Sequence, residues 1–248
     1  MRTEFPDIDR LKATLEAHRP LDPAIVRNLH EDLILRWTYH SNAIEGNTLT
    51  LRETKVALEG ITVGGKTIRE HLEALNHRDA ILLLEEQVRE AGPLTEWTIK
   101  SLHQLILKGI DDANAGRYRT VNVRIAGATH PPPDQLVVPE LMERFIIWYR
   151  EEAIHLHPVE RAARVHRDLV RIRPFVDGNG RTARLLMNLE LMKAGYPAAV
   201  VPVESRLAYY DALDADPAGG ESGLFLGLVT GIVRDSFSPY WHALGLAW

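Results

Sequence analysis

The chain has 248 residues, a formal net charge of −5, 45% hydrophobic residues and 25% charged residues, so we expect a globular protein of one large or two small domains. It contains no cysteine, which excludes disulfides and thiolate metal sites. The negative charge gives no sign of nucleic-acid binding. The start, MRTEFPDIDR, lacks a signal-peptide core, and no apolar run approaches the roughly 20 residues that span a bilayer. These features predict a cytoplasmic protein without a nucleic-acid or membrane partner.

Helical patterns dominate the first half of the chain. Asp22-Pro23 predicts a capped helix start, and helical apolar spacing follows in AIVRNLHEDLILRWTYHSNAIEG. Two capping boxes predict the starts of a short and a long helix: Thr50 with Glu53, and Thr67 with Glu70. The long helix is expected to end at Gly92-Pro93, and another to run from Thr95 to Gly109.

The one β signal lies in RYRTVNVRIAGATHPPPD, where Val121, Val123 and Ile125 alternate before a glycine and three prolines. This pattern predicts a hairpin or flap. Helical patterns resume in LMERFIIWYREE, VERAARVHRDLVRI and RTARLLMNLELMKAG, and again after Glu204 and Gly223. The chain is therefore predicted to be all-α, with a small β-hairpin flap.

The stretch RPFVDGNGRTARLLMN, residues 173–188, has the features of an anion site. Pro174 disfavours the helical conformation at Arg173, so the preceding helix should end there. Gly178 and Gly180 permit a tight turn whose bare amide groups can approach a ligand. The next helix begins at once, and its first amide groups and its dipole favour negative charge.

The side chains around this turn strengthen the anion-site interpretation. Arg181 and Arg184 lie one turn apart at a helix N-terminus, where cations are unfavourable unless a negative ligand offsets them. Asp177 could hold Mg²⁺ against phosphate oxygens. The alternative is a glycine-rich interhelix turn with solvated arginines, which GNG by itself would favour. The aspartate and arginines at these offsets favour a polyphosphate site instead.

These residues also resemble a known family. PFVDGNGRTAR is similar to the Fic signature, H-P-F-x-[D/E]-G-N-G-R-x-x-R. Three further segments resemble the family's flap, the helix before its signature and its inhibitory motif: RYRTVNVRIAG, HPVERAARVHRDLVRI and SNAIEGN. The matching segments span about residues 37–197 in the family's order.

The resemblance implies a helical bundle around the signature loop and transfer of AMP from ATP to a hydroxyl of a target protein, with ATP and Mg²⁺ bound. Asp177 would hold the metal, Arg181 would contact the phosphates and Arg184 the γ-phosphate. Phe175 would anchor the loop in the core. The catalytic positions implied are Arg173, Asp177, Asn179 and Arg181, and the nucleotide-binding positions are Gly178, Asn179, Gly180, Arg181 and Arg184.

Ser41 and Glu45 are the residues that match the inhibitory motif, within residues 41–47. Glu45 falls at a predicted helix C-terminus, where the dipole opposes a carboxylate, so a cationic partner is expected. The resemblance implies that this partner is Arg184 and that the pair blocks the γ-phosphate. The alternative is an exposed glutamate of little energetic consequence.

The resemblance also organises the chain into two parts. Residues 1–92 would form an N-terminal helical region with the inhibitory motif, and residues 93–248 the Fic core with C-terminal helices, packed as one domain. Docking of the target protein would use main-chain pairing with the flap, at Val121, Asn122, Val123, Arg124 and Ile125. A structural hairpin is the alternative. The target stays open, and a homo-oligomer is possible.

Arg173 departs from the family pattern, which has histidine as the general base before Pro-Phe. Arginine has no acceptor lone pair and a pKa above about 12, so it cannot take a proton. His166 lies about 10 Å away along a helix, too far to substitute, and is predicted to be a packed histidine. The sequence alone does not place His130. His155 and His157 are expected in the turn before the helix.

Three explanations of Arg173 therefore remain open: a natural variant with altered chemistry, a nucleotide-binding pseudoenzyme, or a substitution that silences the protein. We expect a Fic-type protein adenylyltransferase that binds ATP and Mg²⁺, is inhibited by Glu45, and is impaired or altered by Arg173. The alternatives are an inactive regulatory nucleotide binder and a relative with different phosphate-transfer chemistry.

Overall fold

The structure is a computed structural model that describes residues 5–124, 131–215 and 223–248. In these ranges it is helical and contains no strand, which confirms the all-α prediction. The elements in chain order are α1 (Pro6–Ala17), α2 (Pro23–Ile44), α3 (Leu51–Leu58), α4 (Ile68–Glu90), α5 (Glu96–Leu107), η1 (Gln135–Val137), α6 (Val138–Glu151), η2 (Ala153–His155), α7 (Pro158–Ile172), α8 (Asn179–Lys193), η3 (Val203–Ser205), α9 (Arg206–Asp214), α10 (Leu224–Asp235) and α11 (Ser238–Leu244).

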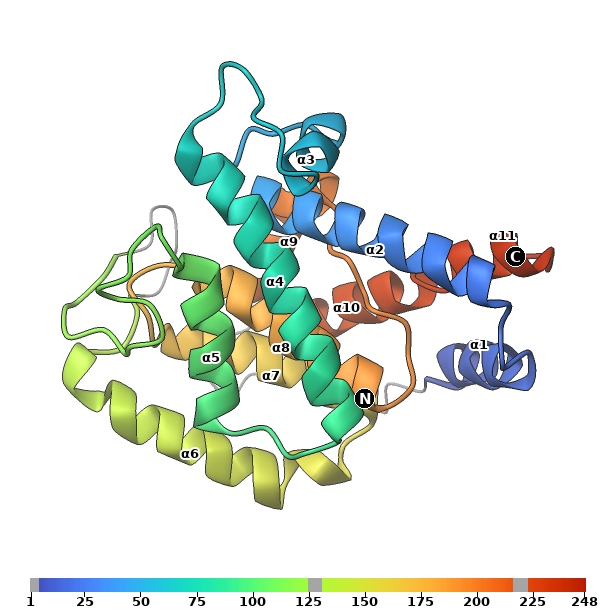
Figure 1. Cartoon of the computed structure of the whole chain (residues 1–248). Helices are drawn as coiled ribbons and strands as arrows, with labels where there is room; N and C mark the ends of the chain where they lie inside the picture. Colours follow the sequence, from blue (N-terminus) through green and yellow to red (C-terminus); the bar gives the residue numbers. More distant parts are fainter. Residues whose placement is uncertain (1–4, 125–130, 216–222) are drawn as a thin grey trace.

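Helix α8 lies at the centre of the bundle (Figure 1). It packs most extensively against α7, and also against α4, α5 and α2. Most of its side chains are buried, including Leu185, Leu186 and Leu189. Because the signature loop joins α7 to α8, the loop and the first turn of α8 are held between helices from both halves of the chain.

The predicted caps start the helices where expected. The Asp22 carboxylate accepts a hydrogen bond from the Ala24 amide, and Thr95 accepts one from the Thr98 amide. Both capping boxes form, at Thr50 with Glu53 and at Thr67 with Glu70. Satisfying the free amide groups in this way fixes the first turns of α3 and α4. The capping box at Thr67 thereby fixes the backbone position of Arg69, which lies on the first turn of α4.

The predicted β segment is not a strand where the structure describes it. Residues 121–124 have irregular backbone, and Ile125 lies outside the described residues, as does His130. Side chains hold this segment in place of a paired strand. The Asn122 amide donates to Asp134, and its oxygen accepts from the Gln135 amide. Alternation alone does not provide the partner strand that a hairpin requires.

One hydrophobic core joins the two predicted regions, since Trp37 and Ile81 belong to the same buried cluster as Leu102 and Leu186. The domain boundary at residues 92–93 stays a prediction.

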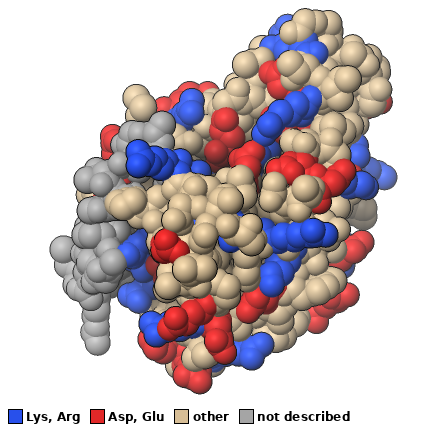
Figure 2. All heavy atoms as spheres, turned by 90° about the vertical axis from the view of Figure 1, so that its left-hand side faces the viewer, with Lys and Arg blue, Asp and Glu red and all other residues tan. Residues whose placement is uncertain are grey.

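Over the described ranges, no helix combines the length and apolarity that crossing a membrane requires. Basic and acidic side chains are interspersed on the face shown in Figure 2.

Candidate nucleotide site

The signature loop turns through two residues in the left-handed region. Helix α7 ends at Ile172, as the following proline predicted, and Arg173 has φ 47°. Gly178 has φ 74° and caps α8. A Cβ atom at Gly178 would lie 3.2 Å from the ring of His103 and 3.2 Å from Ile106, so glycine is required both by φ and by space.

Asn179 holds the loop in its turn. Its side-chain oxygen accepts from the Phe175 amide, and its side-chain nitrogen donates to the Phe175 carbonyl. Phe175 is fully buried and stacks on His103 with ring centroids 3.6 Å apart, which confirms its predicted anchoring position. His103 Nδ1 accepts from the Gly116 amide, so Nε2 carries the proton and donates to the Asp177 carbonyl. Burial chiefly lowers the pKa of His103 to about 4.

Arg184 is buried, and its donors have partners from outside α8. Nε donates to the Ser41 hydroxyl at 3.0 Å, and Nη2 donates to the Ser41 carbonyl and to Glu45 Oε1, both at 2.8 Å. Nη1 donates to the Tyr209 hydroxyl, which is also bonded to His166. Burial alone would lower the pKa of Arg184, but Tyr209 and Glu45 raise it above the ordinary value, so the guanidinium stays charged.

The Glu45 carboxylate lies over the N-terminal turn of α8. Glu45 caps the C-terminus of α2, and its Oε1 would be 2.3 Å from a Cβ atom built on Gly180. The carboxylate therefore occupies the space above Gly180 beside Arg184, where the helix dipole and the guanidinium both favour an anion. The predicted pairing of Glu45 with Arg184 is present in the geometry.

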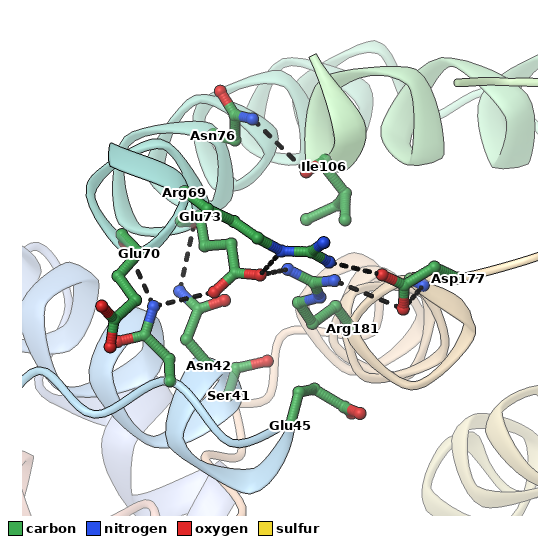
Figure 3. Close-up of polar contacts among 12 residues, drawn as sticks. Ser41, Asn42, Glu45, Arg69, Glu70, Glu73, Asn76, Ile106, Asp177 and Arg181 are labelled. Atoms are coloured by element: carbon green, nitrogen blue, oxygen red, sulfur yellow. Dashed lines mark hydrogen bonds and ion pairs between the residues drawn. The ribbon is translucent and has the colours of Figure 1, made fainter. Parts of the chain in front are cut away.

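Arg181 lies among charged groups but has weak partners. Its side chain is 2% exposed, yet its ion pairs with Glu73 and Asp177 are 3.5 Å and 3.7 Å long, and its Nε has no hydrogen-bond partner. Arg69 lies next to it, between the same two carboxylates (Figure 3). A buried donor without a partner carries a desolvation penalty, which a bound anion would relieve.

Asp177 fits a Mg²⁺ site that is completed by substrate phosphates. Burial acts to raise the pKa of Asp177, but Arg181, the Gly178 amide and Arg69 outweigh it and hold the pKa below its ordinary value. The carboxylate is therefore ionised and half exposed. The described residues contain no group of three or more His, Asp or Glu suited to a metal. One carboxylate plus phosphates is the arrangement that Mg²⁺ usually takes.

Neither His166 nor His103 can replace the base that is missing at Arg173. The backbone carbonyl of Arg173 accepts a hydrogen bond from Arg119 Nε at 2.8 Å. The Nε atom of the Arg173 side chain is buried and has no hydrogen-bond partner among the described residues. His166 is fully buried and bonded to Tyr209, as expected of a packed histidine. His103 uses both ring nitrogens to hold the loop.

Several residues that shape the site were not identified from the sequence. Arg119 bonds to the carbonyls of Arg173, Val121 and Pro133 and so joins the loop to residues 121–124. Arg69, Glu73, Tyr209 and His103 were also missed, because nothing in their local sequence connects them to the signature loop. Asn188, one helical turn beyond Arg184 on α8, bonds to both backbone polar groups of Ala199.

The fold and loop together define a helical bundle whose signature loop has the features of an anion site, with an internal carboxylate beside it. The chain belongs to the Fic/DOC family, whose match covers residues 93–191. Fic-1 from C. elegans has a similar structure, with a TM-score of 0.88 and 32% identity over 97% of this chain and 72% of that one. A Fic-domain signaling protein from Bacteroides thetaiotaomicron has a TM-score of 0.88 and 30% identity over 97% of this chain and 98% of that one.

Curated relatives are named protein adenylyltransferases. The chain is 40% identical to the Drosophila grimshawi protein adenylyltransferase Fic over 83% of this chain and 41% of that protein. It is 38% identical to the C. elegans protein adenylyltransferase fic-1 over 79% of this chain and 39% of that protein. The chain thus spans about two fifths of the length of these relatives.

Proposed function

We propose that the chain is a protein adenylyltransferase that transfers AMP from ATP to a hydroxyl of a target protein, with Glu45 as its internal inhibitor. The observation that carries the proposal is the Glu45 carboxylate above the first turn of α8, bonded to Arg184 at 2.8 Å. A carboxylate held there fills an anion site, and the name adenylyltransferase that the relatives carry supports ATP as the source of the anion.

The signature loop would bind and orient the polyphosphate. The amide groups of Asn179 and Gly180 and the weakly paired donors of Arg181 would bind the phosphates, while the Asn179 side chain keeps the loop closed on Phe175. Arg184 would take the γ-phosphate once Glu45 leaves. A bound Mg²⁺ at Asp177 would neutralise phosphate charge. Phosphoryl-type transfer depends heavily on such positioning and charge stabilisation.

The reaction requires an acceptor for the proton of the target hydroxyl, and this chain has no such acceptor at position 173. The target hydroxyl oxygen bonds to the α-phosphorus, the bond to the α,β-bridging oxygen breaks, and pyrophosphate leaves. The hydroxyl proton must go to an acceptor, and the Arg173 side chain offers none, so water is left to take it. A missing general base typically lowers the rate by 10²–10⁴, so transfer by this chain should be slow.

The same observation at Arg173 favours a second candidate, a regulatory module that binds ATP without turnover. A relative that uses another phosphate donor or breaks another bond is the third. Transfer of label from the α-phosphate supports AMP transfer, and transfer from the γ-phosphate alone supports a kinase-like reaction. Binding without either supports the module.

The deciding experiment is an assay of label transfer from α-labelled ATP to the chain itself and to lysate proteins. The unchanged chain and Arg173→His are compared, each with and without Glu45→Gly. We expect the histidine variants to transfer label at least about 100-fold faster than their arginine partners, because a base is restored. If Glu45→Gly with Arg173 labels proteins as fast as Glu45→Gly with Arg173→His, transfer does not need a base at position 173. No labelling by any variant that binds ATP would favour the module.

We propose that target docking involves residues 121–124 beside the loop. Val121 is 51% exposed and the segment is fixed by Arg119 and Asn122, so it offers an ordered backbone to a second chain. An extended target segment would pair with main-chain groups of this segment. Val121→Pro restricts the backbone of this segment. It should reduce labelling of a target protein and leave the affinity of the chain for ATP nearly unchanged.

A further inference from the structure

Arg69 reaches the signature loop from the first turn of α4, 108 residues away in sequence. Its Nη2 donates to Asp177 Oδ2 at 2.9 Å. The Arg69 side chain is 57% exposed, so it can leave this partner without disturbing the core. Figure 3 shows its guanidinium next to that of Arg181, with both directed at Asp177.

A second contact keeps Arg69 at the site when the first is broken. Its Nε donates to Glu73 Oε1 at 3.1 Å, one helical turn away. Glu73 is itself held, because its other carboxylate oxygen accepts from Asn47 and its carbonyl accepts from Asn42. One edge of the guanidinium is therefore fixed by Glu73, and the other edge is free to exchange partners.

The four charged side chains balance one another in the absence of ligand. Arg69 and Arg181 supply two positive charges, and each pairs with both Glu73 and Asp177, which supply two negative charges. A divalent cation on Asp177 would repel the Arg69 guanidinium from that carboxylate. The cluster would then hold two unmatched positive charges beside the phosphates that complete the cation's coordination.

We propose that Arg69 is a further phosphate-binding residue, which Asp177 holds until a divalent cation displaces it. This inference rests on the proposed function, because it places the cation on Asp177 and a polyphosphate on the loop. On displacement, Arg69 exchanges the Asp177 carboxylate for a phosphate oxygen while Nε stays on Glu73. Charge-assisted bonds between arginine and phosphate favour this exchange.

Binding of inorganic tripolyphosphate and of ATP, measured by calorimetry, tests the proposal without any need for turnover. All variants carry Glu45→Gly so that Arg184 is open. The variants are Arg69→Gln, Asp177→Asn and the double variant, each with Mg²⁺ and with EDTA. The matched control is Arg144→Gln, since Arg144 is 71% exposed and forms an i,i+4 pair with Glu140 on α6.

In saturating Mg²⁺, Arg69→Gln should weaken tripolyphosphate about 10-fold, and Arg144→Gln should leave it unchanged. In EDTA, Asp177→Asn should strengthen tripolyphosphate about 10-fold because it releases Arg69, and this gain should shrink to less than about 3-fold when Arg69 is also glutamine. The Mg²⁺ concentration at half-saturation should be lower in Arg69→Gln than in the parent variant, since the cation no longer competes with Arg69 for Asp177.

Two results would overturn the proposal: unchanged tripolyphosphate affinity in Arg69→Gln with Mg²⁺, or an equal gain from Asp177→Asn in both backgrounds. Arg69 would then be only a surface ion-pair partner. The two ligands separate this failure from that of the proposed function. Tripolyphosphate binding that depends on Arg69, without ATP binding, would support Arg69 and contradict the nucleotide assignment. ATP binding and label transfer that do not depend on Arg69 would support the proposed function and contradict the role of Arg69.

Discussion

Glu45 shows how one side chain can be unfavourable locally and favourable in the folded chain. It caps the C-terminus of α2, where the helix dipole opposes a carboxylate. Arg184 offsets this cost with a direct hydrogen bond, and that bond occupies the arginine that a γ-phosphate would need. The inhibition proposed for Glu45 would therefore depend on competition between two anions for one guanidinium.

Replacing Glu45 with glycine should raise the affinity for ATP with Mg²⁺ by about 10-fold or more, since a charge-assisted bond of about 1.5–3 kcal/mol no longer competes. Calorimetric titration measures this directly. Glu59→Gly is a matched control, because Glu59 is exposed, caps the C-terminus of α3 and also precedes a glycine. An unchanged affinity in Glu45→Gly, or an equal gain in Glu59→Gly, would remove Glu45 from the regulation of the site.

At the scale of elements, the loop between α7 and α8 uses its two glycines differently. Gly178 has positive φ and faces His103 and Ile106, both fixed in the core. Gly180 has ordinary helical backbone, and a Cβ atom there would meet the carboxylate end of the Glu45 side chain. One glycine therefore shapes the turn, and the other leaves space for an anion.

Alanine substitutions should separate these two functions. Gly178→Ala should destabilise the protein by about 1–3 kcal/mol, because it combines positive-φ strain with close contacts. Gly180→Ala should change stability by less than about 1 kcal/mol and yet abolish polyphosphate binding, since its methyl group fills the anion position. Thermal unfolding and calorimetry measure the two effects. Equal losses of stability would contradict this division.

The same scale shows the limit of local pattern. Caps at Asp22, Thr50, Thr67 and Thr95 were predictable because the capping side chain and its amide partner lie within three residues. The strand predicted from Val121 and Val123 failed in the described segment, since a strand depends on a distant partner. In its place, Arg119 and Asn122 hold that backbone through side-chain bonds.

For the whole molecule, three buried histidines should make stability sensitive to acid. Burial lowers the pKa of His103 to about 4 and also lowers the pKa values of His77 and His166. The unfolded chain binds these protons near pH 6.5, before the folded chain does. The stability is therefore complete above about pH 6.5 and is lost as the pH falls toward 4, by up to about 1.4 kcal/mol per unit for each histidine.

Urea unfolding at several pH values tests this expectation. His103→Gln should reduce the slope of unfolding free energy against pH between about 6.5 and 4, because one proton-linked group is removed. His155→Gln, which changes an exposed histidine, should leave the slope unchanged. A slope in His103→Gln equal to that of the parent chain would show that His103 does not contribute to the acid sensitivity.

The sequence by itself determined the helical class, the helix starts and the turn of the signature loop, because each depends on neighbours within a few positions. It also showed that Arg173 offers no proton acceptor, which is a property of the residue type. The family resemblance had implied that Glu45 pairs with Arg184. Only the tertiary structure decided that Ser41 and Tyr209 also hold Arg184, and that Arg69 reaches Asp177. These contacts join helices far apart in the chain, and packing around α8, not local pattern, brings them together.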